Sequence, residues 1–85
     1  MNPLEAFKYM KDTGKSVKAE KTPHWIDNPL WIEMEYQWRS DNSIVTLHKG
    51  KVVVDVQDTM DWMNWWMNFC YNTNSRSHNV ELIPV

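Results

Sequence analysis

The segment 58–71 carries apolar side chains on two sides of the helix that its pattern predicts. At about 100° per residue, its aromatic side chains share one side of the helix, and its Met and Cys side chains share the opposite side. The aromatic side consists of Trp62, Trp65, Trp66 and Phe69. The Met side consists of Met60, Met63, Met67 and Cys70. Because a surface helix needs only one apolar stripe to pack on its own domain, the second stripe predicts a further partner, most simply another copy of the chain.

The N-terminal segment has the start and stop signals of a short helix. Asn2 and Glu5 form an Asn-x-x-Glu capping box, and Pro3 suits the first helical position. Gly14 is the expected left-handed residue after the last turn. We therefore place this helix at residues 3–12.

Several further segments have the alternation or the β-branched composition of strands. A tight hairpin at 49–51 joins two of them, and Asp58 is expected to cap the Trp/Met-rich helix that follows. The last strand is expected at a sheet edge because of Pro84. The strands are expected at 15–20, 30–38, 44–48, 52–56 and 80–85, and the loops at 21–29, 39–43 and 72–79.

The segment 30–38 alternates most clearly, and the alternation predicts two strand faces. One face is expected to carry Ile32, Met34, Tyr36 and Trp38, and the other to carry Trp31, Glu33, Glu35 and Gln37. Trp31 would then lie among polar residues, either as a partner-contact residue or as a platform for base stacking. Core filling by Trp31 is the open alternative.

These elements together predict a single α+β domain over residues 1–85. An N-terminal helix precedes an antiparallel sheet of three to five strands, and a second, long Trp/Met-rich helix packs on the sheet. A chain this short buries only about 60–65% of its unfolded surface, so homo-oligomer formation would add stability.

Composition and charge argue against several classes of function. The net charge of -2 argues against a general nucleic-acid binder. The longest apolar stretch contains Asp61, Asn64 and Asn68, which argues against a membrane span. The single cysteine, Cys70, excludes an internal disulfide and fits a reducing cytosol. We expect no signal peptide, because Met1 leads directly into a capped helix pattern.

The sequence contains no recognisable catalytic or metal-binding motif, so we expect no enzyme, cofactor or metal. Glu33 and Glu35, about 7 Å apart on one strand face, are either a solvated surface or an acid–base pair that acts with a histidine. Lysines recur at spacings of three or four and are either a solvated face or a rim that attracts phosphate. They are Lys8, Lys11, Lys15, Lys18 and Lys21, with Lys49 and Lys51 further along.

The helical segment from Glu5 to Lys11 is followed by Gly14-Lys15-Ser-Val17, then by Trp25 and the strand opening at Leu30. A loose Asp-x-x-Asp-Trp follows later, ending at Trp62. In these features the chain resembles the second Thoeris anti-defence family, which consists of small phage proteins. It departs from that family in that its Asp-Trp pair begins a long apolar helix instead of leading into a terminal strand.

The resemblance implies a homo-oligomeric sponge in the host cytoplasm, which binds and sequesters a cyclic nucleotide immune signal without cleaving it. It carries over Trp25 and Trp62 as the aromatic residues of the ligand site. We add Lys15, His24 and Arg39 as ligand-binding residues from their charge and position.

The alternative hypothesis is a protein-binding inhibitor of a host defence or host-takeover target, similar to an anti-CRISPR protein. Its docking surface would be the Trp/Met surface or the strand face that carries Trp31. Enrichment in Trp, Tyr and Met fits a protein interface.

Overall fold

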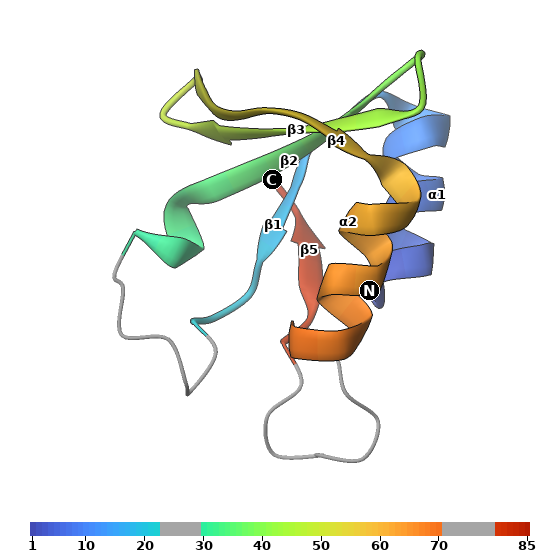
Figure 1. Ribbon diagram of the computed structural model, residues 1–85. Helices are drawn as coiled ribbons and strands as arrows, with labels where there is room; N and C mark the ends of the chain where they lie inside the picture. The colour runs from blue at the N-terminus through green and yellow to red at the C-terminus, as the bar shows by residue number, and fades with distance from the viewer. Residues whose placement is uncertain (23–29, 71–79) are drawn as a thin grey trace.

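The computed structural model describes residues 1–22, 30–70 and 80–85, which form an α+β domain (Figure 1). This confirms the predicted fold class, with two helices packed on one antiparallel sheet. No helix in these three ranges is long and apolar enough to cross a membrane. The elements in chain order are α1 (Pro3–Thr13), β1 (Val17–Ala19), the 3₁₀ helix η1 (Trp31–Glu33), β2 (Met34–Arg39), β3 (Ser43–His48), β4 (Lys51–Asp58), α2 (Thr59–Trp65), the π-helical turn η2 (Trp66–Cys70) and β5 (Leu82–Pro84).

Within the described residues the sheet has five strands in the order β4-β3-β2-β1-β5, and all neighbours are antiparallel. β5 lies at one edge, as Pro84 predicts. Tyr36 and Trp38, two residues apart on β2, face the same side of the sheet. Tyr36 contacts Trp62 of α2. Trp38 contacts Phe7 of α1, so both helices pack on this side of the sheet (Figure 1).

The capping signals place both helices where the sequence predicts them. The Asn2 side chain accepts a hydrogen bond from the Glu5 N–H at 2.8 Å, and the Glu5 carboxylate accepts one from the Asn2 N–H at 3.1 Å. Gly14 has a φ of 70° and ends α1. The Asp58 carboxylate accepts hydrogen bonds from the first-turn N–H groups of α2, at 2.9 Å and 3.4 Å.

The core lies between the two helices and the sheet. Trp62 and Trp66 are its largest side chains, at 1% and 0% exposure, so the aromatic side of the second helix faces the sheet. The side chains of Phe69 and Cys70 lie outside the described part of the structure. The other core residues are Ala6, Met10, Val17, Ala19, Tyr36, Ile44, Val80 and Leu82.

The start of the second predicted strand was wrong. Residues 31–33 form η1, and strand alternation begins only at Met34. A 3₁₀ helix turns about 120° per residue, whereas a strand alternates by 180°. Trp31, expected among the polar residues, is therefore half-buried against the core. Ile32, expected on the opposite face, is 44% exposed.

A candidate ligand-binding pocket

A pocket with a volume of about 340 Å³ lies where α2 and η2 meet the helix-covered face of the sheet. Its lining is aromatic and apolar, with two polar side chains and no charged one among the described residues. The aromatic lining residues are Trp31, Tyr36, Trp62, Trp65 and Trp66, and the others are Met34, Thr46, Val53 and Gln57. We call this cavity the tryptophan pocket.

The sequence spacing explains how one short helix supplies three of these indoles. Trp62 and Trp66 are four residues apart and therefore share a helix face, which is buried against the sheet. Trp65 lies on the flank of that face and is only half-buried. Trp31 reaches the same cluster from η1, because the 3₁₀ turn rotates it toward α2.

Trp66 is the centre of the aromatic cluster. Its ring centroid lies 5.6 Å from that of Tyr36, 5.8 Å from that of Trp31 and 5.8 Å from that of Trp65. The ring of Trp66 is edge-on to two of these neighbours and tilted to the third, which are the arrangements that aromatic pairs prefer. The rings therefore pack against one another and form one continuous wall of the pocket.

Three indole N–H groups in this wall have no hydrogen-bond acceptor. The Nε1 atoms of Trp31, Trp62 and Trp66 are buried and unpaired within the described ranges. A buried polar group without a partner costs about 1–3 kcal/mol, and buried indole N–H groups usually have one. Each of these atoms exposes less than 1 Å², so neighbouring protein atoms cover the three donors and they do not lie on the open surface of the pocket.

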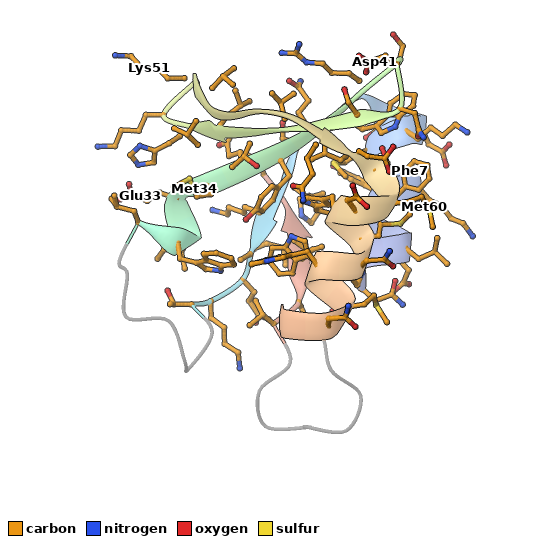
Figure 2. The ribbon with its side chains drawn as sticks, in the orientation of Figure 1. Phe7, Glu33, Met34, Asp41, Lys51 and Met60 are labelled. Carbon is orange, nitrogen blue, oxygen red and sulfur yellow. The ribbon has the colours of Figure 1, made fainter. Side chains whose placement is uncertain are left out.

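A hydrogen-bonded pair of side chains, His48 and Glu33, lies beside the pocket, next to Met34. His48 pairs with Met34 across β2 and β3, and its Nε2 lies 2.7 Å from Oε2 of Glu33. Figure 2 labels Glu33 and Met34, which lie where η1 meets β2. The hydrogen bond from His48 lowers the pKa of Glu33, and the charges of Lys49 and His48 lower it further, against a smaller opposing effect of burial. The pair ties η1, and with it Trp31, to β3.

The structure separates the predicted ligand-binding residues. Trp62 lines the tryptophan pocket. Lys15 and Arg39 are exposed and do not line it. By the register of β1 and β2, both lie toward the Arg39 end of β2, opposite the end that carries Met34. His24 and Trp25 lie outside the described residues.

The sequence missed Trp65 and Trp66 as site residues, and it offered Trp31 as a stacking platform only on the polar face of a strand. Trp65 and Trp66 were assigned to the core side of the helix, and no local signal shows that a cavity remains there. Trp31 was assigned to the wrong face, because the segment beginning at Leu30 has the β-forming composition of a strand although it forms a 3₁₀ turn.

The proposed acid–base pair is not arranged as the alternation suggested. Glu33 lies on η1 and binds His48, whereas Glu35 lies on β2 opposite Lys18 and Leu47. Within the described ranges, no cluster of three or more His, Cys, Asp or Glu side chains is arranged to hold a metal ion. Comparison of the chain with protein-family models, with curated proteins and with solved structures finds no match.

Proposed function

We propose that this protein binds a cyclic nucleotide immune signal and sequesters it without cleaving it, with the tryptophan pocket as the part of the site that holds the base. The observation that carries the proposal is a pocket of about 340 Å³ whose wall is formed mainly by the aromatic rings of Trp31, Tyr36, Trp62, Trp65 and Trp66. Such a wall offers aromatic ring surfaces against which a base can pack. The resemblance to the second Thoeris anti-defence family supports the same function.

The absence of charged groups from the described pocket lining supports binding rather than turnover. General acid–base catalysis needs a titratable side chain within hydrogen-bond reach of the reacting atoms. The nearby Glu33 and His48 are paired with each other and do not line the cavity.

The Met side of the second helix supports a homo-oligomer. Met60 and Met67 are 56% and 42% exposed, and Leu4 of α1 is 51% exposed. We call these three residues the Met surface; they lie on α1, α2 and η2, and α1 contacts α2. Figure 2 shows Met60 at the outer side of α2. Exposed apolar groups on neighbouring helices are typical of an interface.

The charges around the Met surface fit a second copy of the same chain. Asp61 on α2 is exposed, and residues 59–70 contain no basic residue. On α1, Lys8 and Lys11 are exposed and share a helix face with Leu4. In a two-fold dimer with α1 of one copy on α2 of the other, these lysines would meet Asp61 twice, because a two-fold interface uses the same surface on both copies.

A thermal-shift experiment with cyclic dinucleotides and cyclic ADP-ribose isomers tests the function. A ligand at a hundred times its Kd adds about 2.7 kcal/mol to the free energy of unfolding, which raises Tm by about 10–20 °C for a domain of this size. Mass spectrometry after heat release should recover the ligand intact. No shift with any of these ligands would refute the proposal, and recovery of a cleaved ligand would replace sequestration with catalysis.

A matched pair of variants assigns the shift to the pocket. Trp31 and Trp38 are both half-buried tryptophans packed against the core, but only Trp31 lines the pocket. Trp31→Ala should remove most of the ligand-induced shift. Trp38→Ala should lower the Tm of the free protein and leave the ligand-induced shift unchanged.

The second candidate function is inhibition of a host protein through the Met surface. Its support is the exposure of Met60 and Met67 on a single helix, because Met side chains adapt to varied partner surfaces. This function would be favoured if the wild-type chain captured one host protein in stoichiometric amount and the Met60→Glu variant did not. Unchanged capture by Met60→Glu would exclude the Met surface as the docking site.

A further inference from the structure

We infer that the hairpin between β3 and β4 binds a phosphate group of the ligand through Lys49 and Lys51, beside the tryptophan pocket that holds the base. The inference rests on the proposed function and adds an anion-binding part to the same site. It follows from the uncharged lining of the pocket, the positions of the cationic side chains and the register of the sheet.

The pocket leaves the phosphate of a nucleotide outside. Its volume of about 340 Å³ lies near the lower end of the range of about 300–1,000 Å³ for small-molecule sites, and a cavity of about 150 Å³ already takes one benzene ring. A base fits, but a complete cyclic dinucleotide does not. Among the described residues no charged side chain lines the pocket, and burying a phosphate without a counter-charge is strongly unfavourable. The phosphate therefore needs a cation beside the pocket.

Few cationic side chains are placed to meet this need. Every described residue of the lining belongs to the segment 30–70, which contains only three Lys or Arg residues, Arg39, Lys49 and Lys51. Arg39 ends β2, whereas Met34, which lines the pocket, begins it. Lys49 and Lys51 belong to the hairpin at the Met34 end of the sheet. The two lysines are therefore the cations of this segment that lie nearest the pocket along the sheet.

The register connects the hairpin to the pocket wall. Met34 lies opposite His48 on β3, and His48 lies opposite Lys51 on β4. Directly opposite residues share one face of a sheet, and adjacent strands are about 4.8 Å apart. This row of residues therefore begins in the pocket wall at Met34 and ends about 10 Å away at Lys51. Figure 2 shows Met34 and Lys51 at the same end of the sheet, away from Asp41.

Lys49 occupies an unusual backbone position for a lysine. It has a φ of 52°, and Gly50 after it has a φ of 80°; a two-residue turn of this kind favours Asn-Gly. The hydrogen bond from His48 is the main cause of the lowered pKa of Glu33, but the charge of Lys49 contributes, which places Lys49 close to η1. In the part of the chain that the structure describes, His48 binds the Glu33 carboxylate, whereas Lys49 and Lys51 form no ion pair. Both ammonium groups are therefore available to an external anion.

The test is a set of NMR titrations of the full chain with cyclic di-AMP, cyclic di-GMP and cyclic ADP-ribose, and with adenosine and guanosine as probes without phosphate. Lys49→Asn and Lys51→Gln should each weaken binding of the cyclic nucleotides by about 1.5-fold to fivefold, the contribution of one exposed ion pair. The double variant should weaken it by about twofold to 25-fold. The affinities for adenosine and guanosine should not change. In about 1 M salt, where the Debye length is about 3 Å, the wild-type chain and the double variant should bind the cyclic nucleotides alike.

Two features of the variants separate binding from stability and from net charge. Asn adopts a positive φ more readily than Lys, so Lys49→Asn should not lower the Tm of the free protein. Lys18→Gln is the matched control, because it removes the same charge from the other face of the sheet. Lys18 lies opposite Glu35, which faces away from the helices because its neighbour Tyr36 faces them. Lys18→Gln should leave every affinity unchanged.

Four results would overturn the inference. If the double variant bound the cyclic nucleotides with wild-type affinity, the phosphate would be held elsewhere, and sequestration would stand without this inference. If Lys18→Gln weakened binding as much as Lys49→Asn, the effect would come from net charge and not from a site. If the hairpin variants lost affinity for adenosine and the cyclic nucleotides equally, the lysines would act on the pocket and not on the phosphate. If none of the cyclic nucleotides bound the wild-type chain, the proposed function and the inference would both fail.

Discussion

Replacing Met60 with Ala tests whether the Met surface joins two copies of the chain. Met60 is 56% exposed, so its side chain contributes little to the stability of a single copy. Met63, by contrast, is partly buried against the core, so a polar substitution there would lower the folding stability of a single copy in addition to any effect on assembly. Met60→Ala therefore separates assembly from folding.

The exposed fraction of Met60 sets the expected magnitude. Full burial of a Met side chain contributes about 1.5–3 kcal/mol. Burying the exposed 56% would contribute about 0.8–1.7 kcal/mol per copy. A two-fold interface contains the residue twice, which gives about 1.7–3.4 kcal/mol. At about 1.4 kcal/mol per tenfold change, the Kd of the dimer should rise about 20- to 300-fold.

Sedimentation velocity over a wide concentration range measures the dimer Kd of the wild-type chain and of Met60→Ala. Far-UV circular dichroism melts of dissociated samples should show the same Tm for both. Val52→Ala is the control, because Val52 is 47% exposed on β4 and lies outside the Met surface. It should leave the dimer Kd unchanged.

A wild-type chain that sediments as a single copy at every concentration would refute the assembly argument, as would a Met60→Ala dimer with the wild-type Kd. If Val52→Ala weakened the dimer while Met60→Ala did not, the copies would associate through the exposed edge strand β4. The Met surface would then need a different partner.

Three predictions concern stability. The pKa of Glu33 is lowered in the folded state, so its bond to His48 stabilises the protein at pH values above about 4.5. This contribution is lost as the pH falls below that value. Glu33→Gln should therefore flatten the acid side of the curve of Tm against pH. Asp58→Ala removes the cap of α2 and should cost about 0.5–2 kcal/mol in urea unfolding, whereas Asp58→Asn should cost less. Met10→Ala removes a side chain that is 1% exposed and should cost about 2–5 kcal/mol; a smaller loss in the same assay would show that the core collapses into the cavity.

The fold was predictable because its signals are local and agree with one another. The capping box at Asn2 and Glu5 and the left-handed Gly14 determine α1 from a few neighbouring residues. Strands β2, β3 and β4 follow one another as hairpins, so their pairing needs no long-range information. The position of β1 between β2 and β5 is a long-range arrangement, and nothing in the sequence of three-residue strands specifies it.

The candidate site was predictable only in part, because a pocket is a property of packing. Trp62 was identified by its place in a motif, and the same helix pattern marks Trp66 as buried. Neither observation reveals the cavity between them and the sheet. The decisive error was at Trp31, where a 3₁₀ turn and a strand have similar composition but opposite side-chain directions. That single rotation moves an indole from the polar face into the pocket wall.

The two proposed binding surfaces meet at the π-helical turn η2. Trp66 begins this turn and lines the pocket, while the next residue, Met67, is 42% exposed on the Met surface. A π turn inserts one residue into a helical turn and is frequent at functional sites. Here it places two adjacent side chains on the two proposed binding surfaces. If a ligand reorients Trp66, the backbone that carries Met67 moves with it. Thermodynamic linkage then requires that ligand binding and dimer formation change each other's affinity by the same factor. The apolar side chains on two sides of this helix would thus couple assembly to ligand capture. A helix with only one apolar side would provide only one of the two binding surfaces.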